Sequence, residues 1–106
     1  MEFAFASKDL REICEDDSIA RKKFGDEVSR ILVNRLADLR SASSITGLPA
    51  GYPCTVQGEE AVFELCQGYQ LVITANHPDN PVTDSGDVDW SRVHRIKIIK
   101  IADIHD

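Results

Sequence analysis

Positive charge is missing from the middle of this sequence. Residues 41–91 contain no lysine or arginine but seven acidic residues, and the net charge of the 106-residue chain is −6. Non-specific binding to nucleic acid comes largely from cations that neutralise phosphates. This composition therefore argues against a general nucleic-acid binder, and we expect no direct DNA binding by the chain alone.

Cysteine and long apolar runs are also scarce. Cys14, Cys54 and Cys66 form no Cys-x-x-Cys pair, and neither they nor the three histidines show zinc-ligand spacing. This argues against a disulfide framework and a metal site, so we expect no metal and no cofactor. No apolar run approaches the roughly 18 residues that span a bilayer, and the first residues lack the features of a signal peptide. We therefore expect a cytoplasmic protein without membrane association.

The first half of the sequence has helical periodicity. Phe3–Phe5 alternates with smaller residues and predicts a short first strand, and Ser7 suits the N-cap of a helix. From residue 17 or 18 to about Ala42, apolar residues recur at 3.6-residue spacing and predict one long second helix. Gly25 lies within it and is expected to permit a bend.

The second half of the sequence changes to strand-like patterns. Three strands are predicted there: Cys54–Val56, Ala61–Cys66 and Tyr69–Thr74. Gln67-Gly68 predicts a tight hairpin between the last two, and a polar loop over residues 76–87 precedes a terminal strand from Arg95. We expect a single α+β domain over residues 1–106, with an N-terminal helical hairpin packed on a small, mostly antiparallel sheet.

The terminal strand carries charged residues that suit phosphate chemistry. Asp103 lies two residues before His105, so both side chains point the same way in an extended strand. A carboxylate beside an imidazole favours its protonated form, which suits a general acid. Arg95 and Lys97 share a face by the same rule, unless a bulge near Ile98-Ile99 changes the register. Metal-independent RNA cleavage needs a base, cations and an acid; the alternative is an ordinary sheet edge with solvated charges.

Four segments are similar to a known family in their order and spacing. These segments are FASKDLREICED, RLADLRSAS, LPAGYP and DWSRVHRIKIIKIADIHD. Together they resemble the HigB-like branch of the RelE/ParE toxins, whose relatives are also labelled killer or killer suppression proteins. The resemblance implies a RelE-like fold, a cognate antitoxin that often carries a helix-turn-helix domain, and cleavage of mRNA on the ribosome.

The resemblance carries over only part of the family's site. Asp103 and His105 match the family's terminal Asp-Tyr-His and are the implied catalytic pair, with Ile104 in place of the tyrosine. The implied RNA contacts are Arg92, Arg95, Lys97 and Lys100. Tyr52-Pro53-Cys54 stands where relatives read Arg-Pro-His, and Gln70 stands where they place an arginine. Residues 56–60, with Glu59 and Glu60, replace a basic segment.

Two functions follow from this combination. The first is the toxin of a type II toxin–antitoxin system, a ribosome-dependent mRNA endoribonuclease with a reduced site; its partners are the antitoxin, the ribosome and mRNA. The second is a non-catalytic RelE-like module that docks an antitoxin or regulator through the acidic surface of residues 41–91. A third interpretation is a plain acidic α+β domain whose ending resembles the toxins by chance.

Overall fold

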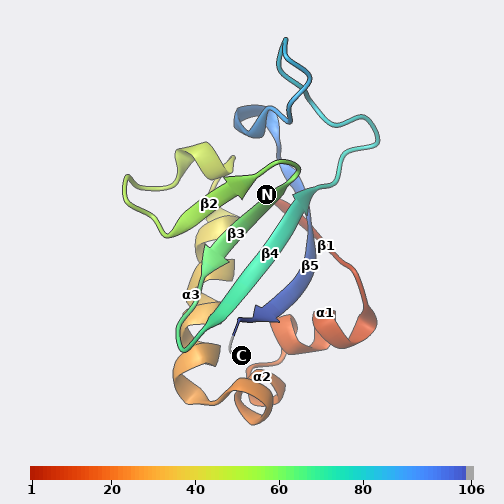
Figure 1. The fold of residues 1–106 in the computed structure, drawn as a ribbon. Helices are drawn as coiled ribbons and strands as arrows, with labels where there is room; N and C mark the ends of the chain where they lie inside the picture. The colour runs from red at the N-terminus through yellow and green to blue at the C-terminus, as the bar shows by residue number, and fades with distance from the viewer. Residues whose placement is uncertain (105–106) are drawn as a thin grey trace.

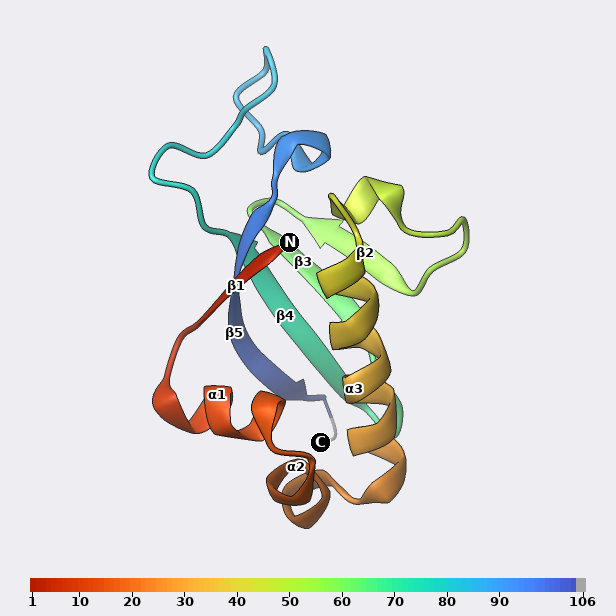
Figure 2. The same ribbon diagram turned by 180° about the vertical axis from the view of Figure 1, so that it is seen from behind.

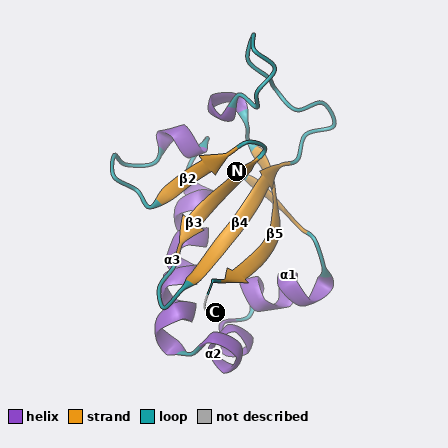
Figure 3. Cartoon of the chain, in the orientation of Figure 1, coloured by secondary structure: helices purple, strands orange, loops and turns teal. Residues whose placement is uncertain are grey.

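The fold is three helices followed by most of a five-stranded sheet (Figures 1 and 3). A computed structural model describes residues 1–104. Its helices and strands, in chain order, are β1 (Glu2–Phe5), α1 (Lys8–Glu15), α2 (Asp17–Phe24), α3 (Asp26–Ser41), β2 (Cys54–Gln57), β3 (Glu60–Glu64), β4 (Tyr69–Ala75) and β5 (Arg95–Asp103). Two 3₁₀ turns complete the list: Ile45–Gly47 precedes β2, and Trp90–Arg92 lies between β4 and β5. The predicted α+β class is confirmed.

The helical part differs from the prediction at one glycine. Ser7 caps α1 as expected, since its hydroxyl accepts the Leu10 N–H at 3.1 Å. The single long helix predicted from residue 17 or 18 is wrong, because Gly25 separates α2 from α3. Gly25 has φ 90° and ψ 170°, a region that is essentially restricted to glycine. The chain therefore breaks at Gly25 instead of bending there.

The core lies between α3 and one face of the sheet, as the view from behind shows (Figure 2). The helix contributes an apolar stripe of side chains at helical spacing: Val28, Leu32, Leu36 and Leu39. The sheet contributes alternate residues of its central strands: Ala61, Phe63, Leu71, Ile73, Ile96 and Ile98. Since strand side chains alternate between faces, the residues between these core positions point away from α3.

The sheet has the strand order β1-β5-β4-β3-β2. Strand β1 pairs parallel with β5, and all other neighbours pair antiparallel. The predicted hairpin between β3 and β4 is confirmed, with φ 54° at Gln67 and φ 81° at Gly68. Positive φ at both central residues is the pattern of a type I′ turn, which matches the twist of the flanking strands.

A bulge interrupts the pairing of β4 with β5. Val72 lies opposite Lys100, whereas the next residue, Ile73, lies opposite Ile98. Ile99 is therefore the extra residue on β5, at the place where the sequence allowed a bulge. Every residue of β5 after the bulge therefore lies on the face opposite to the one that strict alternation would give it.

Candidate functional site

One face of the sheet is not covered by the helices, and we call it the open face (Figure 1). It consists of the residues between the core positions of the three central strands: Glu60, Val62, Glu64, Gln70, Val72, Thr74, Arg95, Lys97 and Lys100. Its residues align across strands, so Lys97, Thr74 and Glu60 form one transverse row. The open face contains the expected RNA-contacting cations of β5.

The bulge aligns three cations along β5, namely Arg95, Lys97 and Lys100, which we call the cation row. Lys97 lies opposite Thr74 and Lys100 opposite Val72, so both lysines share the open face, and Arg95 precedes Lys97 by two residues. Without the extra residue, simple alternation would turn Lys100 toward the core. Neighbouring cations in this row lie about 6.7 Å apart along the strand, since two strand residues span that length.

The structure does not place Asp103 with those cations. Asp103 lies opposite Tyr69, whose ring packs edge-to-face on Phe24 of α2 with ring centroids 5.0 Å apart. Asp103 therefore lies on the helix-covered side of β5, while Arg95 and Lys97 lie on the open face. His105, the expected general acid, lies outside the described residues. Strict alternation along β5 would place Asp103 on the same face as Arg95 and Lys97. The bulge moves Asp103 to the opposite face.

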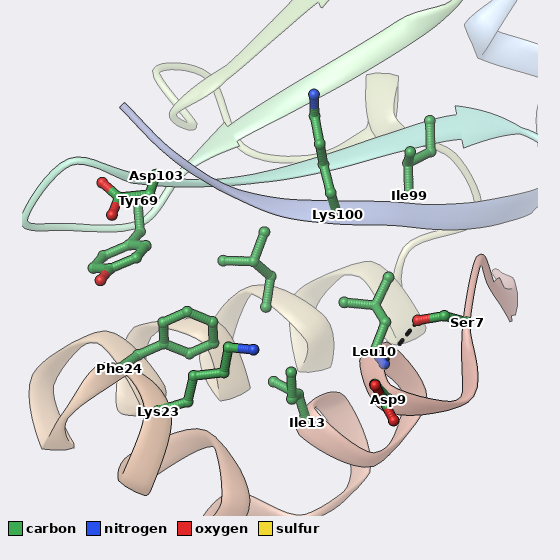
Figure 4. A pocket seen from close by; sticks show the side chains of 11 residues that line it. Ser7, Asp9, Leu10, Ile13, Lys23, Phe24, Tyr69, Ile99, Lys100 and Asp103 are labelled. Atoms are coloured by element: carbon green, nitrogen blue, oxygen red, sulfur yellow. Dashed lines mark hydrogen bonds between the residues drawn. The ribbon is translucent and has the colours of Figure 1, made fainter. Parts of the chain in front are cut away.

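Asp103 lines a cavity of about 430 Å³ between the end of β5 and helices α1 and α2 (Figure 4). Its floor is apolar, with Leu10, Ile13 and Ile101, and its charged groups are Lys23, Asp9 and Asp103. Lys100 belongs to its rim, but its side chain extends away from the helices, on the other side of the strand (Figure 4). The cavity and the cation row are therefore separate features on opposite faces of β5.

Arg92, the fourth expected RNA contact, is engaged within the protein. Its Nε lies 2.9 Å from an Asp89 carboxylate oxygen, and its Nη2 donates to the Val82 carbonyl at 2.8 Å. Hydrogen bonds from Ser91 and Arg92 hold the pKa of Asp89 below its usual value. These contacts tie the loop before β5 to the turn Trp90–Arg92, so the structure favours a structural role for Arg92.

Carboxylates share the open face with the cation row. Glu60 and Glu64 lie on β3, two strands away from β5, and the Gln70 amide donates to Glu64 at 2.7 Å. Two strand spacings amount to about 9.6 Å, slightly more than the Debye length of about 8 Å at physiological salt. A phosphate beside β5 would therefore interact more strongly with the lysines than with these glutamates.

Tyr52, which precedes Pro53, is part of a structural cluster. The Tyr52 hydroxyl donates to Asp38 at 2.8 Å, and the Arg35 guanidinium lies 5.3 Å from its ring centroid. Burial and the Asp38 carboxylate raise the pKa of Tyr52 to about 12. Arg35 also donates to the Glu64 carbonyl at 3.0 Å. This cluster joins α3 to the sheet and offers no free cation to a phosphate.

Two histidines meet at the start of β5. The Nε2 atom of His77 accepts the backbone N–H groups of His94 and Arg95 at 3.1 and 3.4 Å, and the two imidazole centroids lie 4.4 Å apart. Burial, followed by the charges of His94 and Arg95, lowers the pKa of His77. His77 therefore acts as a neutral acceptor that fastens the loop to the strand.

Within residues 1–104, no group of three or more histidine, cysteine or acidic side chains is arranged to hold a metal ion. None of the helices described is both long and apolar enough to cross a membrane.

Comparisons with protein-family models, curated proteins and solved structures return no match for this chain. The α+β class is therefore established by the elements and their pairing alone. It consists of N-terminal helices packed on a mixed, mostly antiparallel five-stranded sheet.

Proposed function

We propose that this chain is the toxin of a type II toxin–antitoxin pair, in the HigB-like branch of the RelE/ParE toxins. We also propose that it acts on mRNA at the ribosome through its open face. The alignment of Lys97 and Lys100 on the open face, beside Arg95, is the observation that carries this proposal. Arg95 is itself paired with Glu2 at 2.8 Å, so the two lysines are the main phosphate contacts in this proposal. The resemblance of the ordered segments and the helices-then-sheet architecture support it.

The chemistry of this proposal assigns a separate task to each group. RNA cleavage without a metal proceeds by attack of the 2′-oxygen on phosphorus, and the 2′-hydroxyl proton passes to solvent water. The P–O5′ bond breaks, and the leaving 5′-oxygen takes a proton from an acid. The cation row would stabilise the negative charge that grows on the phosphoryl oxygens. His105 is the proposed acid. Asp103, which the sequence paired with it, lies on the helix-covered side of β5 and is given no contact with a phosphate on the open face. The ribosome would hold the mRNA in place, which reduces the affinity that a chain of net charge −6 must supply itself.

The second candidate is a non-catalytic module of the same class that only binds its antitoxin or a regulator. The presence of Glu60 and Glu64 on the open face favours it, because these carboxylates weaken the site for a phosphate strand. The engagement of Arg92 with Asp89 and Val82 favours it further, since that leaves one cation fewer for RNA.

Growth of bacteria after induction of this chain tests the first candidate. We expect arrest by the wild type, loss of arrest in the Lys97→Ala/Lys100→Ala double variant, and arrest by a Lys8→Ala/Lys22→Ala control. Both variants remove two positive charges, and none of the four lysines forms an ion pair within residues 1–104. Unimpaired growth with the wild type at matched expression would contradict the toxin assignment.

A second comparison separates catalysis from binding. His105→Ala should abolish arrest and the cleavage of reporter mRNA detected by primer extension, while it leaves capture of the product of the neighbouring gene unchanged. If wild type and His105→Ala both leave the mRNA intact and both retain that partner tightly, the binding module is the correct interpretation.

A further inference from the structure

Strand β1 forms one edge of the sheet, and its outer side carries no further strand (Figure 2). The backbone N–H groups of Glu2 and Ala6 donate inward to His94 and Ile98 of the β5 segment, both at 2.9 Å. Alternate residues of a strand direct their backbone groups to opposite sides. The N–H and C=O groups of Phe3 and Phe5 therefore point outward and are available to an added strand.

A groove of about 550 Å³ runs beside this edge. Besides β1 itself, its lining includes Arg11 from α1 and Arg40 from α3. The Arg40 guanidinium lies 4.6 Å from the Phe3 ring centroid, and that of Arg11 lies 5.3 Å from the Phe5 centroid. The two guanidinium groups therefore lie beside alternate residues of β1.

These two guanidinium groups have no ion-pair partner among the described residues. Within residues 1–104, ion pairs join Arg21 to Asp17, Arg92 to Asp89 and Arg95 to Glu2, and none involves Arg11 or Arg40. The carboxylates that line the groove are Glu2, which is paired with Arg95, and Glu15. The groove is therefore locally cationic on a chain of net charge −6.

We propose that the β1 edge binds one extended segment of a partner protein that has acidic side chains at alternate positions. The outward backbone groups of Phe3 and Phe5 would form the ladder, and hydrogen bonds of this type supply affinity. Side chains at alternate positions of the added strand lie about 6.7 Å apart on one face, which is also the spacing along β1 of Phe3 and Phe5, against whose rings the two arginines lie. Arg40 and Arg11 would each pair with one carboxylate and so select the sequence. The groove meets the open face at Arg95, but the proposal depends on Arg11, Arg40 and the backbone of β1 and not on the proposed function.

A peptide of five Glu-Val repeats, capped at both ends and labelled with fluorescein, provides the probe. We expect saturable binding that weakens with salt, and at least tenfold weaker binding of the matching Lys-Val peptide. Hydrogen exchange followed by NMR gives the decisive readout, because the amides of Phe3 and Phe5 should become protected in the complex. A Glu-Val peptide with N-methyl groups on the pairing amides should lose that protection.

Charge reversal then tests the two arginines. Arg11→Glu and Arg40→Glu should each weaken binding of the Glu-Val peptide at least tenfold, whereas Arg30→Glu, an exposed arginine outside the groove, should change it less than threefold. Circular dichroism checks that each variant folds, and Arg40→Gln replaces Arg40→Glu if it does not. Equal losses at all three positions, unchanged exchange at Phe3 and Phe5, or no saturable binding would each overturn the proposal.

Discussion

Substitution of Gly25 by alanine tests the break between α2 and α3. An added Cβ would meet no atom within 4 Å, so no steric clash contributes to the effect. The backbone conformation itself, φ 90° and ψ 170°, costs a residue with a side chain about 1–3 kcal/mol. Alanine also restricts the unfolded chain more than glycine does, and this effect stabilises the folded protein by only about 0.4–1 kcal/mol. Because the first effect is larger, we expect Gly25→Ala to destabilise the fold by about 1–2 kcal/mol.

Urea unfolding followed by circular dichroism measures this change, with Gly47→Ala as the matched control. Gly47 does not have positive φ, and its added Cβ would meet only the Ser43 hydroxyl at 4.0 Å. The control should therefore stay within about 0.5 kcal/mol of the wild type or become slightly more stable. A neutral or stabilising Gly25→Ala would refute the reasoning, because it would indicate that residues 17–41 form the continuous helix predicted from the sequence.

Two further predictions concern β5. Burial and nearby charges lower the pKa of His77 from 6.5, so folding favours its neutral form. The contribution of neutral His77 to stability is therefore present above about pH 6.5. This contribution is lost as the pH falls through the lowered pKa. Urea unfolding at about pH 7.5 and 5 should show a larger loss for the wild type than for His77→Gln, and equal losses would contradict this. Deletion of Ile99 should cost less than about 2 kcal/mol, since Ile98 and Lys100 can keep their partners in a regular ladder. Deletion of Lys97, which turns Ile96 out of the core, should prevent folding; failure of the Ile99 deletion to fold would contradict the bulge assignment.

Local signals predicted much of the fold. The Ser7 cap, the Gln67-Gly68 turn and the change from helical to strand periodicity after Pro53 depend on nearest neighbours, and all correspond to observed elements. The break at Gly25 also had a local signal. Asp26 and Glu27 follow the glycine and place acidic side chains in the first turn of α3, where they favour a helix start. The spacing of apolar residues concealed this signal, because Ala20 and Phe24 before the break continue the helical spacing of Val28 after it.

The pairing of β1 with β5 was not predicted, since no local pattern specifies it. Glu2 and Arg95, which face each other across this pair, are 93 residues apart in the sequence. Parallel pairing requires the chain to pass through the helices and the antiparallel strands before it returns. The edge position of β1 and the groove beside it follow from this pairing. No feature of Phe3–Phe5 alone would have identified a binding edge.

The candidate site shows how one residue changes a functional inference. In a strand without a bulge, Arg95, Lys97 and Asp103 would lie on one face. Lys100 would lie on the other face. Because Ile98 and Ile99 are both apolar and β-branched, alternation alone does not decide which residue is extra. With Ile99 as the extra residue, Lys100 joins Arg95 and Lys97 on the open face, and Asp103 moves to the side of the helices. The open face gains a cation for phosphate binding and loses a carboxylate that would repel it. The proposed RNA contact therefore depends on the bulge more than on the composition of the strand.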